Sequence, residues 1–96
     1  MHGEYKMPGG KLVVIDLDLH GARLANVQLS GDFFLEPDGA LDLIDRALEG
    51  QSVDATETEL ALAVARSLDN DVMMYGISPE AIAVAVRRAL HTESEA

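Results

Sequence analysis

The sequence of 96 residues contains no cysteine and no tryptophan. The absence of cysteine excludes disulfide bonds, thiolate zinc sites and cysteine nucleophiles. Other aromatic residues are few, with two Phe and two Tyr, so the core of so small a domain must be built from Leu, Val, Ile and Ala. We therefore expect a thin core, whose stability would benefit from docking onto another protein.

Basic residues are scarce, because seven Lys and Arg stand against seventeen Asp and Glu, for a formal net charge of −10. Residues 1–31 are balanced in charge, so the excess of acid lies in residues 32–96. An acidic surface repels phosphates and anionic lipid headgroups, so we expect neither nucleic acid nor membrane as a partner. The sequence shows neither a secretory signal nor an apolar run of membrane-spanning length, and we expect a cytoplasmic location.

Two alternating patterns predict a pair of strands over residues 11–19 and 23–30. The apolar side chains expected on one face are Val13, Ile15, Leu17, Leu19, Ala25, Val27 and Leu29. These sets coincide across a hairpin if Leu19 faces Arg23, so we expect a loop longer than two residues.

Three helical patterns follow. The first covers residues 38–49, with an apolar stripe that includes Ile44 and Leu48. The second covers residues 57–68, where Thr56 and Glu59 fit a capping box. The third begins at Ser78-Pro79, a strong helix start, and carries the stripe Ile82, Ala85, Val86, Ala89 and Leu90.

The expected fold class is α+β, a small antiparallel sheet from residues 3–7, 11–19 and 23–30 with three helices packed on one face. Phe33 and Phe34, the largest apolar groups after the sheet, should anchor the core. Periodicity does not decide whether residues 72–75 form a short strand or an extended connection. Residues 91–96 are expected to be a frayed tail of this single domain.

Asp16, Asp18 and His20 alternate on one strand face, and all three are residue types that bind metals. Alternate strand residues stand roughly 6.6 Å apart, so three in a row rarely converge on one ion. We interpret them as a solvated polar face and predict no metal site. The sequence also places no serine beside a histidine and a carboxylate, so we predict no catalytic residue in this chain.

The run Lys6-Met7-Pro8-Gly9-Gly10-Lys11 is a basic, glycine-rich loop before a strand. It is not a Walker loop, because the glycine spacing differs and Leu12 replaces the Ser or Thr. Its glycines would still let backbone amides approach an anion, and its lysines supply charge. The alternative is a simple turn between strands.

This loop with the following Leu12, and later Gly31-Asp32-Phe33-Phe34 followed by Pro37, resemble the signature of the C-terminal accessory domain of lipoate protein ligases. The likeness extends over nearly the whole chain and fits the form in which this domain is a separate small subunit. The alanine-rich second helix and the short acidic tail depart from the family pattern.

The resemblance implies an accessory subunit that needs a separate catalytic lipoate protein ligase subunit. Together they would adenylate lipoate with ATP before transfer to a lysine of a lipoyl-acceptor protein, forming a heterodimer. ATP, Mg and lipoate would serve the complex, and the chain alone would bind none of them. Lys6, Gly9, Gly10 and Lys11 would lie near the partner's adenylate site.

The centre of the second predicted helix is apolar almost all round, which suits a helix that is buried on more than one side or pressed against a partner. We therefore expect Leu60, Leu62 and Val64 at the interface with the catalytic subunit. A rival hypothesis is a non-enzymatic acidic protein-interaction module, in which the glycine-rich loop is only a turn. A metal-dependent enzyme using Asp16, Asp18 and His20 is a further alternative.

Overall fold

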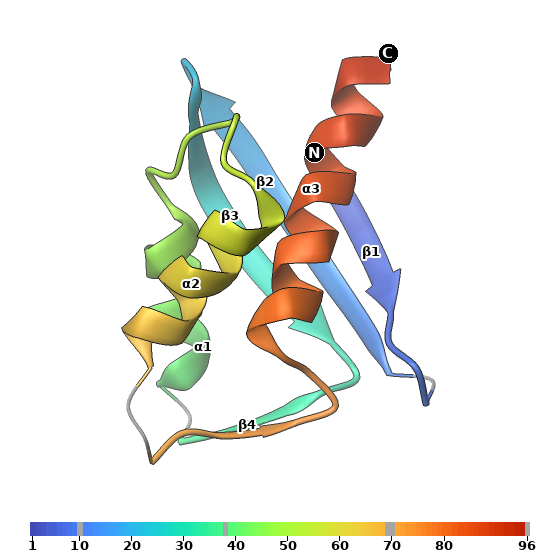
Figure 1. Ribbon diagram of the computed structural model, residues 1–96, viewed down its shortest axis with the longest axis vertical. Coiled ribbons are helices and arrows are strands. Elements are labelled where there is room, and N and C mark those ends of the chain that lie inside the picture. The colour runs from blue at the N-terminus through green and yellow to red at the C-terminus, as the bar shows by residue number, and fades with distance from the viewer. Residues whose placement is uncertain (10, 38, 69–70, 96) are drawn as a thin grey trace.

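Figure 1 shows the chain as a computed structural model that describes residues 1–9, 11–37, 39–68 and 71–95. Within these ranges a three-stranded antiparallel sheet, in the order β1-β2-β3, forms one layer, and three helices cover one of its faces. The strands are β1 (His2–Lys6), β2 (Leu12–His20) and β3 (Arg23–Gly31). The helices are α1 (Ala40–Leu48), α2 (Glu57–Ser67) and α3 (Pro79–Glu95). The predicted α+β architecture is confirmed, and we call this part of the molecule the body.

A two-stranded antiparallel ribbon, β4 (Phe34–Glu36) and β5 (Met73–Tyr75), lies at one end of the body. Figure 1 shows it at the opposite end from the β2–β3 turn. Residues 73–75 therefore form a strand, the point that periodicity left open. We call this pair of strands the ribbon.

The core lies between the sheet and the helices. Its largest fully buried side chains are Ile15, Ile44, Leu48, Leu60, Ile82, Val13, Val64 and Val86. The predicted stripe of α3 is buried along its whole length. Where α3 crosses β1, a Cβ added at Gly3 would lie 2.3 Å from the carbonyl oxygen of Ala85, so glycine is what permits this close approach.

The β2–β3 hairpin turns more tightly than expected. His20 pairs with Arg23 across a two-residue turn, Gly21-Ala22, in which Gly21 has a φ of +64°. Leu19 faces Leu24 and is 39% exposed, so it lies outside the core. The predictions of a longer loop, of Leu19 opposite Arg23 and of Leu19 in the core are wrong.

A β-bulge restores the match between the apolar faces. Asp16 pairs with Gln28 and Asp18 with Ala25, so two residues of β3, Asn26 and Val27, oppose one residue of β2. Asn26 takes a φ of +50°, a left-handed conformation that Asn tolerates better than most residues. The extra residue shifts the alternation, and Leu24, Val27 and Leu29 all point to the core.

Both helix-start predictions are confirmed. Thr56 Oγ1 accepts from the backbone N–H of Glu59 at 3.1 Å, and the Glu59 carboxylate accepts from the Thr56 N–H at 2.9 Å, closing the capping box of α2. At α3, Ser78 Oγ accepts from the Ala81 N–H at 3.1 Å. This helix runs on to Glu95, through the segment where we expected a frayed tail.

The first helix is shorter than predicted. It begins at Ala40. Its expected first residue, Asp38, lies outside the described residues. Asp69 and Asn70, which follow α2, also lie outside them. None of the helices in the described ranges has the length and apolar character needed to cross a membrane.

The outer edge of β3 is covered by α1 and by the segment that follows it. The backbone N–H of Val27 donates to a Glu49 carboxylate oxygen at 3.3 Å, and that of Leu29 donates to Asp45 Oδ1 at 3.1 Å. Nearer the turn, the Leu24 N–H donates to the Gln51 carbonyl at 2.9 Å. Burial raises the pKa of Asp45 to about 6, although the Leu29 hydrogen bond acts to lower it.

Candidate functional site

The two glycine-containing segments that carry the ligase resemblance touch in the folded chain. The backbone N–H of Asp32 donates to the carbonyl oxygen of Leu12 at 3.0 Å. A Cβ at Gly31 would lie 2.1 Å from that same oxygen, and Gly31 has a φ of +143°, so a side chain there meets both a steric clash and backbone strain. We call residues 6–12 and 31–34 together the signature corner.

The loop from β1 to β2 projects from this corner. Lys6 pairs with Leu12 at its base, and the Met7 N–H donates to the Lys11 carbonyl at 2.7 Å. Gly9 has a φ of +99°, which explains a glycine at that position. Gly10, the other predicted glycine of the site, lies outside the described residues.

Lys11 is exposed, but its aliphatic stem packs onto the chain just after β5. A Cβ at Gly76 would lie 2.7 Å from Lys11 Cγ, so the stem covers this glycine. Within the described ranges neither Lys6 nor Lys11 takes part in a salt bridge. The stem is therefore held by packing, while the ammonium group is available to an anion.

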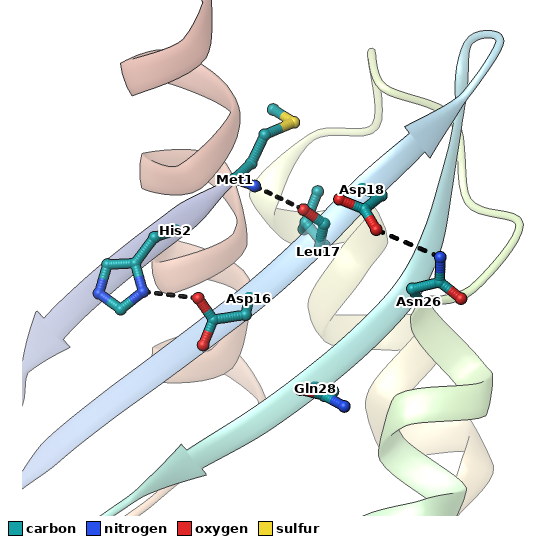
Figure 2. Close-up of a pocket in the computed structure, with 7 residues that line it drawn as sticks. All are labelled: Met1, His2, Asp16, Leu17, Asp18, Asn26 and Gln28. Atoms are coloured by element: carbon teal, nitrogen blue, oxygen red, sulfur yellow. Dashed lines mark hydrogen bonds and ion pairs between the residues drawn. The ribbon is translucent and has the colours of Figure 1, made fainter.

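A polar hollow of about 370 Å³ lies on the sheet at the other end of β1 and β2, shown in Figure 2. Its lining residues are Met1, His2, Asp16, Leu17, Asp18, Asn26 and Gln28. His2 Nε2 lies 2.6 Å from a Glu4 carboxylate oxygen and Nδ1 lies 2.7 Å from Asp16 Oδ1. These two hydrogen bonds raise the pKa of His2. The protonated ring is thus favoured, and both ring nitrogens are engaged with carboxylates, so neither is free to take a proton from a bound molecule.

The predicted polar face of β2 does not converge on one point. Figure 2 shows Asp16 directed at His2 and Asp18 directed at Asn26, whose Nδ2 donates to Asp18 at 3.2 Å. Across the described residues no group of three or more His, Cys, Asp and Glu side chains is arranged to hold a metal ion. The hollow therefore offers hydrogen-bonding groups without a cluster of metal ligands.

Helix α2 does not present the predicted interface residues together. Leu60 and Val64 are fully buried in the chain's own core, while Leu62 is 47% exposed. Leu60 and Val64 belong to the stripe that packs inward against α1 and α3. This corrects the expectation for both residues, and only Leu62 of the three is available to a partner.

Comparison with known proteins connects this geometry to a family. No protein-family model matches the chain. Among curated proteins, lipoate-protein ligase A subunit 2 of Thermoplasma acidophilum is 30% identical over 77 residues, which cover 79% of this chain and 77% of that protein. The chain belongs to the lipoate-protein ligase A subunit 2 family. The resemblance carried by the signature corner is thereby confirmed.

A solved structure extends the agreement to the fold. It describes an archaeal lipoylation system, a bi-partite lipoate protein ligase and its E2 lipoyl domain from Thermoplasma acidophilum. One of its chains superimposes with a TM-score of 0.68 at 27% sequence identity, covering 91% of this chain and 98% of that chain. The fold described here is thus shared with almost the whole of one chain of that archaeal system.

The sequence analysis missed the exposed apolar side chains of the ribbon. Met73 is 48% exposed, Tyr75 is 50% exposed and Phe34 is 58% exposed. The rings of Phe34 and Tyr75 pair at a centroid distance of 6.2 Å. Phe33 packs partly buried against the core, so the prediction that both phenylalanines anchor the core is wrong for Phe34. Successive strand residues point to opposite faces, and that alternation was the available signal.

Proposed function

We propose that this chain is the accessory subunit of a two-component lipoate protein ligase. It acts with a separate catalytic subunit in the ATP-dependent adenylation of lipoate, before the lipoyl group passes to a lysine of an acceptor protein. The observation that carries the proposal is the signature corner, where two segments typical of the accessory domain meet through the Asp32 to Leu12 hydrogen bond. Membership of the subunit 2 family supports it.

Lys11 is the residue that we assign to the adenylate site of the complex. Its stem is packed on Gly76, so the ammonium group extends from a defined base and less side-chain freedom is lost on binding. It stands in the charge-balanced third of an otherwise acidic chain. A charge-assisted contact of a lysine with phosphate contributes about 1.5–3 kcal/mol, which corresponds to about a tenfold to a hundredfold change in rate.

The other parts of the reaction are assigned to the partner. ATP, Mg and lipoate bind to the catalytic subunit, and the acceptor protein reaches this chain only through the complex. Lys6 and Gly9 shape the loop that presents Lys11, since Lys6 closes its base and Gly9 supplies the left-handed turn. We assign no bond-making step to this chain.

Reconstitution tests this proposal. Lipoyl adenylate formation is measured by pyrophosphate release from the catalytic subunit, alone and with the purified chain, and we expect release only with both. Lys11→Ala should slow adenylation by about tenfold to a hundredfold, while transfer from preformed lipoyl adenylate stays near the wild-type rate.

Arg66→Ala is the matched control, because Arg66 is also exposed and lies in the last turn of α2, outside the signature corner. It removes the same charge and should leave adenylation unchanged. Wild-type adenylation by Lys11→Ala would reject the role of the loop. A catalytic subunit that is fully active without this chain would reject the accessory function itself.

A further inference from the structure

Three of the four side chains on the outward face of the ribbon are apolar. Phe34 pairs with Tyr75 across the two strands, and Glu36 pairs with Met73 on the same face. Their neighbours Leu35 and Met74 point the other way and pack against the core. We call Phe34, Met73 and Tyr75 the ribbon patch.

The ribbon patch exposes three large apolar side chains on one face of the ribbon. Each of its three side chains is about half exposed, which leaves on the order of 100 Å² uncovered per side chain. The sum of these areas, about 300 Å², lies in the range of the largest apolar patch on a typical monomer, and such a patch is often functional. Aromatic side chains at the centre of an interface are also the type that contributes most to binding.

A hollow of about 330 Å³ adjoins the patch, between the end of β3 and α1. Phe34 lines it together with the apolar side chains Leu29, Phe33, Leu35 and Leu41. A hollow of this kind beside two exposed rings suits an anchoring apolar side chain from another protein. The patch and the hollow therefore form one continuous apolar surface.

The charge of the chain argues against a second copy as the occupant. A formal net charge of −10 on 96 residues makes copies of this chain repel one another. The patch also covers only a part of the roughly 800 Å² per partner that a stable interface needs. A homodimer would thus have to bring further acidic surface together, whereas a different protein can offer complementary charge around an apolar centre.

The position of Lys11 indicates which protein that is. Its stem covers Gly76, the residue directly after Tyr75, so the ribbon patch adjoins the lysine that we assign to the adenylate site. Because Tyr75 and Gly76 are consecutive, a protein seated on the patch would come close to Lys11. We infer that the ribbon patch is the surface by which this chain docks on the catalytic subunit of its ligase, an inference that rests on the proposed function.

Binding measurements with the full chain and the catalytic subunit test the inference. Phe34→Ser and Tyr75→Ser should each raise the Kd for the catalytic subunit at least about tenfold, because both side chains are anchors of the interface. Leu19→Ser is the matched control, since Leu19 is another partly exposed apolar side chain, near the β2–β3 turn at the far end of the molecule. It should bind with the wild-type Kd.

Leu62→Ser tests the alternative interface on α2, where the sequence analysis placed it. Weakened binding for Leu62→Ser with wild-type binding for both ribbon variants would overturn the inference. Hydrogen exchange on the wild-type complex gives a readout that does not depend on variants folding. Amides of residues 33–36 and 73–76 should gain protection on binding, and those of residues 19–23 should not; the reverse pattern also overturns the inference.

The same titrations separate this inference from the proposed function. Ribbon variants should raise the concentration of accessory subunit that gives half-maximal adenylation, whereas Lys11→Ala should lower the rate at saturation. If the wild-type chain stimulates adenylation but the ribbon variants titrate normally, the docking surface alone is rejected. If the chain binds through the ribbon without stimulating adenylation, the docking surface stands and the proposed function is rejected.

Discussion

The body and the ribbon use their apolar side chains in opposite ways. In the body, Ile15, Leu60 and Ile82 are fully covered by the chain itself. In the ribbon, Phe34, Met73 and Tyr75 are left about half exposed, although the chain has few aromatic residues in all. A thin core that leaves two of its four aromatic rings at the surface indicates that those rings serve contacts outside the chain.

The largest expected effect comes from removing similar amounts of apolar side chain in the two regions. Leu60→Ala should lower the free energy of unfolding by about 2–5 kcal/mol, because it opens a cavity at a fully buried position. Met73→Ala, on the exposed face of the ribbon, should change it by less than about 1 kcal/mol. Urea denaturation followed by circular dichroism measures both. Equal losses of stability in the two variants would mean that the ribbon contributes to the stabilising core as the body does.

A smaller but still clear effect is expected at the contact of β1 with α3. Gly3→Ala places a methyl group 2.3 Å from the Ala85 carbonyl oxygen and 2.5 Å from the Ala89 nitrogen, so the helix and strand must separate. Overpacking of this kind costs about 1–3 kcal/mol. Gly39→Ala is the control, since nothing lies within 4 Å of a Cβ there and its φ is −69°. Thermal melts of the two variants that coincide would contradict the close packing of the body.

The pH dependence of stability should be set in part by Asp45. Its pKa is raised from 3.8 to about 6 in the folded chain, so between those values the native state holds a proton that the unfolded chain has released. Stability from this group is thus present below about pH 4 and lost as the pH rises through about 6. Asp45 is only partly buried, and solvent screening reduces the effect.

Asp45→Asn isolates this contribution, because the amide oxygen still accepts from the Leu29 N–H while the titration is removed. Free energies of unfolding measured by urea at intervals from pH 4 to pH 7 should fall more steeply for the wild type than for the variant. Parallel profiles would show that Asp45 ionises in the folded chain as it does in the unfolded chain.

The smallest effect is expected from His2 on the exposed face of the sheet. Hydrogen bonds to Glu4 and Asp16 raise its pKa above 6.5, so its contribution is complete below about pH 6.5 and is lost as the pH rises through the raised pKa. Above that pH, the melting temperature of His2→Gln should change slightly less with pH than that of the wild type. NMR titration of the ring should give a lower pKa for His2 in Asp16→Asn than in the wild type. An unchanged His2 pKa in Asp16→Asn would show that the hydrogen bond to Asp16 does not raise it.

The body was the part of the fold that local pattern could predict. The helix starts at Thr56 and Ser78 rest on hydrogen bonds between residues three apart, so their signals lie within a few residues of sequence. The strand register needed more, because the bulge at Asn26 depends on a backbone conformation that alternation does not encode. The alternating pattern predicted the two strands, but it predicted the wrong residue pairs across the hairpin.

The candidate site shows the same limit at longer range. The glycine-rich loop and the 31–34 segment were identified by resemblance, and their contact through Leu12 and Asp32 became visible only in the fold. The ribbon pairs Phe34 with Tyr75, residues separated by α1 and α2, and no local period links them. Leu60 and Val64 were misplaced because an apolar helix surface is equally compatible with a core and with a partner.

The covering of β3 bears on how the free subunit avoids self-association. An edge strand with open backbone groups is a template on which another chain can add a strand and start an aggregate. Here the Val27 and Leu29 amides already donate to Glu49 and Asp45, and residues 50–53 occupy the edge nearer the turn. Strand addition at this edge would have to displace the chain's own acceptors. A subunit made before its partner can therefore keep an apolar surface ready for assembly while its sheet stays closed to growth from that side.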